Sequence, residues 1–138
     1  METITPVERT LTQSDHLRLT RLLAQQRHQL PGVEALRDML DTSDVVASRA
    51  VPSSVVTMHS RVLLEDPVRG GMPFQLTVCY PEEADPAAGA ISVLSPVGAA
   101  LLGLCVGETA RWSTPGGEGA ARILSVLFQP ENGGEGAA

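Results

Sequence analysis

The chain has 138 residues, of which 43% are hydrophobic and 19% are charged, and its formal net charge is -6. This length predicts one compact domain with at most a small appendage. The charge argues against direct nucleic-acid binding, which needs a dense basic patch, because the ten basic residues are all arginines scattered along the chain.

The N-terminal third has the pattern of an amphipathic helix. Residues 1 to 10 show no lasting hydrophobic period and are expected to form an extended lead-in. After Leu11, leucines recur at helical spacing, Thr12 or Ser14 can cap the helix, and Asp15 favours its positive end. A helix of about 15 to 18 residues is predicted, ending at Pro31.

A second amphipathic helix follows that break. Two such helices joined by a short turn bury their apolar faces on each other, which predicts a short antiparallel hairpin, a coiled coil, over residues 1–47. Because a short hairpin is marginally stable alone, a monomer or weak dimer is expected. The apolar stripe expected on the second helix consists of Val33, Leu36, Met39, Leu40 and Val46.

The rest of the chain alternates in the manner of strands. Pro52 and small polar residues make 48–54 a linker, 55–130 should form the main domain, and the composition of 131–138 predicts a disordered tail. The predicted fold class is α+β, a mostly antiparallel sheet of about five strands with one buried helix. The strands are expected at 55–58 with 61–64, 74–80, 91–93, 108–113 and 121–128.

The stretch AISVLSPVGAALLGLCVG, residues 90–107, predicts a strand that turns sharply into a buried helix. Ser95 is a preferred N-cap type, and Pro96 suits the first helical position, where its missing N–H costs nothing. The helix that follows is apolar nearly all round, so it should be buried.

This stretch resembles the corresponding strand and helix of bacterial Gre-type transcript cleavage factors. Three further stretches, PSSVVTMHSRV at 52–62, Tyr80-Pro81, and WSTPGG at 112–117, make the chain similar to the nucleoside diphosphate kinase regulator branch of the Gre superfamily. The resemblance covers roughly residues 30 to 130 and implies an FKBP-like C-terminal domain.

The resemblance also implies a partner surface. In Gre-like factors the strand-to-helix corner grips the rim of the secondary channel on the β′ subunit of RNA polymerase. The matching partner-binding residues here are Leu94, Ser95, Pro96 and Gly98. Gre factors commonly carry Asp where this chain has Leu94, so that ionic contact is missing.

The hairpin tip departs from the cleavage factors, whose long coiled coil carries acidic residues that help hold a catalytic Mg²⁺ in the polymerase. The tip here contains a single carboxylate, Glu34, after the turn, and the hairpin is short. The expected function is therefore a non-catalytic regulator that binds RNA polymerase and competes with Gre-type factors. The tip residues are His28, Leu30, Pro31, Gly32 and Glu34.

Three alternatives remain open from the sequence. The first is regulation of nucleoside diphosphate kinase or nucleotide metabolism, acting indirectly or through another protein. The second is a true cleavage factor, which Glu34 and Asp38 would have to support. The third is an FKBP-type isomerase or ligand-binding role, against which the scatter of four aromatic residues argues.

No residue pattern indicates an enzyme. Histidines and cysteines are too far apart to form a metal cluster, and no glycine-rich phosphate loop leads into a helix, so neither metal nor cofactor is expected. Cys79 and Cys105 are expected to be reduced, buried thiols. Without a leader or long apolar run, the protein is expected to be soluble, away from membranes and cytoplasmic.

Overall fold

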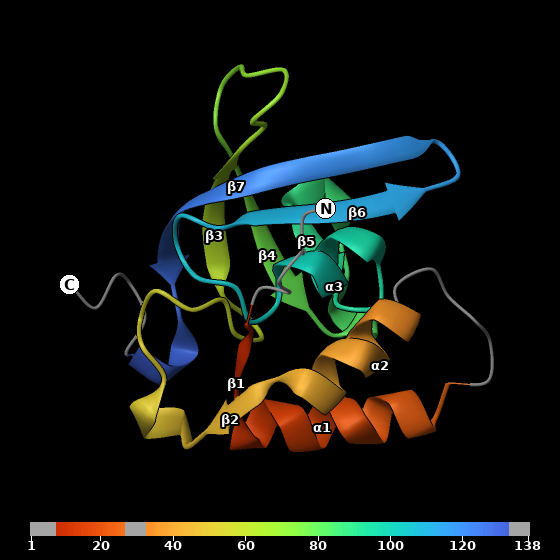
Figure 1. Ribbon diagram of the computed structural model, residues 1–138, viewed down its shortest axis with the longest axis vertical. Helices are drawn as coiled ribbons and strands as arrows, with labels where there is room; N and C mark the ends of the chain where they lie inside the picture. Colours follow the sequence, from red (N-terminus) through yellow and green to blue (C-terminus); the bar gives the residue numbers. More distant parts are fainter. Residues whose placement is uncertain (1–7, 27–32, 133–138) are drawn as a thin grey trace, which may run out of the picture.

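The computed structural model describes residues 8–26 and 33–132 and has an α+β fold built on a curled five-stranded sheet (Figure 1). The strand order is β5-β4-β3-β7-β6, and every neighbouring pair is antiparallel except β4 and β5. The predicted sheet of about five mostly antiparallel strands with one buried helix is confirmed. The strands are β3 (Arg61–Glu65), β4 (Phe74–Cys79), β5 (Ala90–Ser92), β6 (Thr109–Thr114) and β7 (Gly117–Phe128).

The buried helix α3 (Pro96–Leu101) follows β5 directly, as its sequence predicts. The Ser95 side chain accepts a hydrogen bond from the Gly98 backbone N–H, and Pro96 occupies the first turn. Leu101 and Leu102 are fully buried. The helix lies against the inner face of the sheet beneath β6 (Figure 1).

Two further helices, α1 (Gln13–Ala24) and α2 (Val33–Thr42), lie side by side below the sheet (Figure 1). The Thr12 hydroxyl caps α1 by accepting from the Asp15 N–H at 3.0 Å, as predicted. The helix is 12 residues long, shorter than expected. It ends in a C-cap at Gln25, where backbone N–H groups donate to the carbonyls of Leu22 and Leu23. The predicted turn residues 27–32 lie outside the described residues.

A pair of short parallel strands, β1 (Thr10–Thr12) and β2 (Asp44–Val46), joins the start of α1 to the end of α2. Val46 is therefore in a strand, and its predicted place on the stripe of the second helix is wrong. Arg9 is also ordered, since its guanidinium donates to the carbonyls of Ala99 at 2.9 Å and Leu102 at 3.0 Å. The expected loose lead-in therefore ends before Arg9.

Three other segments differ from the expected pattern. Residues 55–58 form no strand: Val55 makes an isolated bridge with Cys105, and a turn begins at Met58. Strand β7 begins at Gly117, four residues before its predicted start at 121. Short 3₁₀ turns occur at Ser48–Ala50 (η1), Pro81–Glu83 (η2), Pro86–Ala88 (η3) and Pro130–Asn132 (η4). The predicted disorder is thus wrong for residues 131 and 132, where the Asn132 amide donates to the Val51 carbonyl at 3.0 Å.

The hydrophobic core is continuous from the helices into the sheet. One cluster of buried side chains includes Leu19 and Leu36 from α1 and α2, Val62 and Ile123 from the sheet, and Leu101 from α3. Burial of these apolar surfaces is the main stabilising contribution to such a fold. None of the helices in 8–26 and 33–132 has the length and apolar character needed to cross a membrane.

Candidate functional site

The strand-to-helix corner is built by hydrogen bonds between its own residues. The Ser92 carbonyl accepts from the Ser95 hydroxyl at 2.7 Å and from the Ser95 backbone N–H at 3.0 Å. The Ser92 hydroxyl accepts from the Leu94 N–H at 3.0 Å, and the Ser95 hydroxyl accepts from the Gly98 N–H at 3.1 Å. Two serines thus hold the tight turn that starts α3.

The four residues expected at this partner surface do not share one environment. Leu94 is 3% exposed and belongs to the core, and Gly98 is buried against the backbone of Ser92. Ser95 and Pro96 are half-buried. Any contact that a side chain makes at the corner is therefore left to Ser95 and Pro96, while Leu94 and Gly98 shape the backbone beneath them.

Only one of the predicted hairpin-tip residues lies in the described chain. Glu34 is exposed in the first turn of α2, and one of its carboxylate oxygens is 4.0 Å from the guanidinium of Arg37. His28, Leu30, Pro31 and Gly32 lie outside the described residues. An exposed pair of this kind contributes little to stability.

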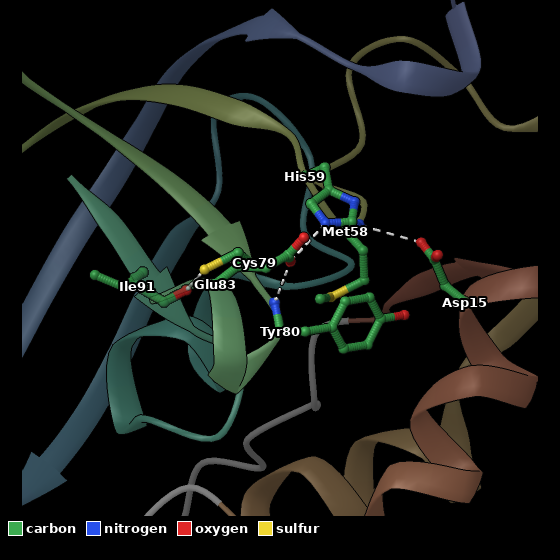
Figure 2. Close-up of polar contacts among 7 residues, drawn as sticks. All are labelled: Asp15, Met58, His59, Cys79, Tyr80, Glu83 and Ile91. Atoms are coloured by element: carbon green, nitrogen blue, oxygen red, sulfur yellow. Dashed lines mark hydrogen bonds and ion pairs between the residues drawn. The ribbon is translucent and has the colours of Figure 1, made fainter. Parts of the chain in front are cut away.

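A junction between α1 and the segments that flank β3 and β4 lies close to the corner and was not predicted (Figure 2). We use the name junction for Asp15 and Arg18 of α1 with Met58, His59, Tyr80 and Glu83. Asp15 is 7% exposed, and its Oδ2 accepts a hydrogen bond from the Met58 backbone N–H at 3.1 Å. Burial raises the pKa of this carboxyl above its usual value, and the bond from Met58 opposes that change.

The other side of the junction is an aromatic ring with a cation on its face. The Arg18 guanidinium carbon is 4.5 Å from the centroid of the Tyr80 ring, and His59 meets that ring edge-on at 5.6 Å. Glu83 Oε1 accepts from His59 Nε2 at 2.8 Å and from the Tyr80 backbone N–H at 3.0 Å. Figure 2 shows Glu83 between these two partners.

His59 itself adopts an unusual backbone conformation. Its φ is +70°, a region that side-chain-bearing residues rarely occupy. The His59 N–H donates to the Val78 carbonyl at 2.7 Å, and the Val78 N–H donates to the Ser60 carbonyl at 3.2 Å. The strained residue is thus fixed by β4 on one side and by Glu83 on the other.

The junction and the corner are neighbours through β4 and β5. Cys79 pairs with Ser92 in the ladder between these strands, and the Cys79 carbonyl accepts from the Val93 N–H at 2.8 Å. Tyr80 is the next residue after Cys79. The contact of α1 with Tyr80 therefore begins one residue after β4, the strand that pairs with β5, and β5 leads into the corner.

Burial raises the pKa of two groups next to the corner and the junction, the Cys79 thiol and the Tyr80 hydroxyl. The Cys79 thiol donates to the Ile91 carbonyl at 3.3 Å, and burial raises its pKa, which keeps it protonated and poorly nucleophilic (Figure 2). The Tyr80 hydroxyl is buried without a hydrogen-bond partner among the described residues, and burial raises its pKa to about 12. Within 8–26 and 33–132, no three His, Cys, Asp or Glu side chains gather to hold a metal ion.

One hollow of about 860 Å³ opens on the inner face of the sheet beyond α3. Phe74 and Trp112 both line it, with Leu76, Val97 and the small residues of β7. The sequence argument was that four scattered aromatic residues would not line one pocket. The curl of the sheet nevertheless brings two of the four together. The hollow is open to solvent, and nothing about it specifies a ligand.

The corner could be predicted from the sequence more readily than the junction could. Ser95 and Pro96 are recognisable because capping and the first helical turn are local properties. The junction depends on pairs 43 and 24 residues apart, Asp15 with Met58 and His59 with Glu83. The one local hint is an acidic residue in the first turn of a helix, which is usually only a response to the helix dipole.

Comparison with known proteins agrees with this architecture. Residues 51–128 match the family model described as transcription elongation factor GreA/GreB, C-terminal. The regulator of nucleoside diphosphate kinase from Escherichia coli K12 is 37% identical over 107 residues, which cover 77% of this chain and 78% of that protein. The transcription elongation factor GreA of Chlorobium phaeobacteroides is 36% identical over 94 residues, 68% of this chain and 59% of that protein.

A solved structure shows the same fold over most of the chain. A prokaryotic transcription elongation factor GreA/GreB from Nitrosomonas europaea superposes with a TM-score of 0.73 and 35% identity, covering 88% of this chain and 98% of that one. The family model alone covers more than half of the sequence, and its residues build the sheet, α3 and the corner between them. The chain belongs to the GreA/GreB transcription elongation factor family.

Proposed function

We propose that this protein is a non-catalytic regulator that binds RNA polymerase near its secondary channel and competes there with Gre-type cleavage factors. The observation that carries the proposal is the Gre C-terminal domain at residues 51–128, with Ser95 and Pro96 half-exposed at its strand-to-helix corner. The β′ rim as the docking surface, the FKBP-like character of the domain and the division of the chain at residues 48–54 are parts of the same proposal.

The helices support binding without transcript cleavage. With 12 and 10 residues, α1 and α2 extend only about 18 Å and 15 Å. The sequence carries no carboxylate between Arg27 and Val33, and Glu34 lies near an arginine of its own helix. A pair of helices of this length with one such carboxylate is poorly suited to hold a metal ion inside the polymerase.

The docking proposal is tested by titrating labelled protein with core RNA polymerase, with and without a Gre factor as competitor. Pro96→Glu is the informative variant, because an acidic residue in the first turn of a helix is compatible with folding and changes the surface. Met72→Glu is its matched control, since Met72 is 87% exposed on the loop between β3 and β4. Ser95 is left intact because it caps α3.

We expect saturable binding that the Gre factor displaces, weakened at least tenfold by Pro96→Glu and less than twofold by Met72→Glu. Wild-type protein that does not bind at micromolar concentration would refute the proposal. Binding that neither the competitor nor Pro96→Glu affects would move the partner surface away from the corner.

The non-catalytic part is tested on a backtracked elongation complex. The expected result is no shortening of the transcript over the level seen with polymerase alone. Shortening that Glu34→Ala abolishes would make the protein a cleavage factor and overturn this assignment. We also expect the protein to work in the cytoplasm, where its proposed partner is, as a monomer or weak dimer.

The name of the E. coli relative favours a second function, regulation of nucleoside diphosphate kinase. The described surface carries no feature specific to a kinase partner, and an effect on kinase levels can follow from altered transcription. A pull-down with purified kinase distinguishes the two, because direct capture without polymerase is expected only from a kinase-binding protein.

A further inference from the structure

We propose that Asp15 and Arg18 are positioning residues that hold the α1–α2 hairpin in one direction relative to the strand-to-helix corner. A partner docked on the corner then meets the hairpin at a fixed place. The statement about the partner rests on the proposed function, whereas the statement about the hairpin concerns the free protein.

Asp15 supplies the buried half of this connection. Its carboxylate crosses from α1 to the turn before β3, where it accepts from the Met58 N–H at 3.1 Å. The backbone N–H of the same residue donates to the Thr12 hydroxyl at 3.0 Å, and Asp15 as a whole is 7% exposed. Hydrogen bonds to a charged acceptor are directional and stronger than neutral ones, so this bond restricts rotation of α1 on the sheet.

Arg18 supplies the exposed half, one helical turn further along α1. Its guanidinium lies over Tyr80 at 4.5 Å, and the backbone and ring of Tyr80 are in turn held by Glu83 and His59. A cation over an aromatic face is attracted electrostatically by the ring. Asp15 and Arg18 therefore contact the rest of the domain at two separate residues, Met58 and Tyr80. Two such contacts restrict rotation of α1 more than a single contact would.

The apolar contacts of α1 do not set this direction by themselves. Leu19 and Leu23 pack into the shared core, and such packing is non-directional. The polar contacts also lie next to the corner, because Tyr80 follows Cys79, which pairs with Ser92. Tyr80, which Arg18 contacts, thus directly follows the strand that pairs with β5, and β5 leads into the corner.

The test measures a distance within the free protein. Spin labels are placed at Gln25→Cys, at the exposed end of α1, and Glu118→Cys on β7, in a Cys105→Ser background, and the distribution is read by double electron–electron resonance in frozen solution. The variants are Arg18→Ala and the double variant Asp15→Ala/Arg18→Ala. Arg21→Ala is the matched control on the same helix, and Asp15→Asn keeps an acceptor for the Met58 N–H.

We expect one narrow distance in wild type, Arg21→Ala and Asp15→Asn. Arg18→Ala should broaden the distribution, and the double variant should broaden it at least twofold or add a second distance. A merely stabilising role would lower the melting temperature without changing the width. An unchanged narrow distance in Arg18→Ala, or equal broadening by Arg21→Ala, would overturn the proposal. Should the double variant not fold, Arg18→Ala decides, because this side chain is exposed.

The polymerase titration then separates this inference from the proposed function. We expect Arg18→Ala to bind core polymerase several-fold more weakly than wild type, because the hairpin no longer meets the docked partner at a fixed place, and to displace the Gre factor correspondingly less. Wild type that fails to bind refutes the proposed function and leaves the distance result standing. Binding and displacement by Arg18→Ala equal to wild type would overturn the inference about the docked partner.

Discussion

Replacing Gly98 with alanine should destabilise the protein through the corner. A methyl group at this position would lie 2.9 Å from the Ser92 carbonyl carbon and 3.0 Å from the Val93 Cα, and nearer still to the Ser92 oxygen. These are backbone atoms, so no side chain can rotate out of the way. Either the start of α3 or the end of β5 must move.

The size of the effect follows from two opposing contributions. Overpacking of a close contact costs about 1 to 3 kcal/mol, and a rigid backbone on both sides favours the upper end. Alanine in place of glycine within a helix returns about 1 kcal/mol. A net loss of about 2 kcal/mol in the free energy of unfolding is expected, which lowers the melting temperature of a chain of this size by roughly 8 °C.

Urea unfolding followed by circular dichroism measures this loss. Gly116→Ala is the matched control, because the nearest atom to a methyl group there is the Thr114 hydroxyl oxygen at an ordinary 3.7 Å, and its stability should stay within about 0.5 kcal/mol of wild type. If Gly98→Ala were as stable as Gly116→Ala, the close approach of α3 to β5 would not be a property of the molecule. Weaker polymerase binding by Gly98→Ala would accordingly reflect a distorted corner.

Three further predictions concern the junction and the hollow. The raised pKa of Asp15 means that folding disfavours its carboxylate form relative to the unfolded chain, so Asp15→Asn should be more stable than wild type at pH 7. This difference in stability should shrink as pH falls through the raised pKa toward 3.8, and a difference independent of pH in urea titrations would contradict the prediction. Glu83 has the opposite sign, because its bond from His59 lowers its pKa below 4.5. Wild type should therefore exceed Glu83→Gln in stability at neutral pH and lose the advantage as pH falls through that lowered pKa, and an advantage that grows in acid would refute the assignment. Gly119→Ala would place a methyl group 2.6 Å from Cζ2 of Trp112, so the indole must move. The emission of this single tryptophan should shift and acrylamide should quench it more, whereas an unchanged spectrum would show that the ring does not lie across Gly119.

The elements that local chemistry determines could be predicted from the sequence. Ser95 as a cap, Pro96 in the first turn and the alternation of β4 are properties of a few adjacent residues, and the structure confirms them. The expectation that α1 would run to Pro31 was wrong, because the spacing of apolar residues does not show at which residue the helical hydrogen bonding ends. The cap at Gln25 ends the helix sooner.

The differences arise where contacts between distant segments override local preference. Residues 55–58 have the composition of a strand, yet the Ser60 hydroxyl accepts from the Thr57 N–H at 2.8 Å and Asp15 accepts from Met58, which together make a turn. Three glycines weigh locally against a strand at 116–119, but Gly119 pairs with Trp112, whose large side chain covers it. The side-chain contacts of the junction could not be predicted for the same reason.

The position of β3 in the sheet has a consequence for synthesis on the ribosome. This strand lies between β4 and β7, and its residues pair with Arg122 through Phe128, close to the C-terminal end of the described chain. The N-terminal β1 likewise cannot complete its contacts until later segments are synthesised, because it pairs with Asp44–Val46 and the Thr10 N–H donates to the Gly103 carbonyl. Non-local pairing of this kind is slow because its loops must close first. The nascent chain therefore leaves one edge of β3 unpaired until β7 emerges. A ribosome that pauses before residue 117 holds a chain in which only β3, β4 and β5 of the sheet can pair.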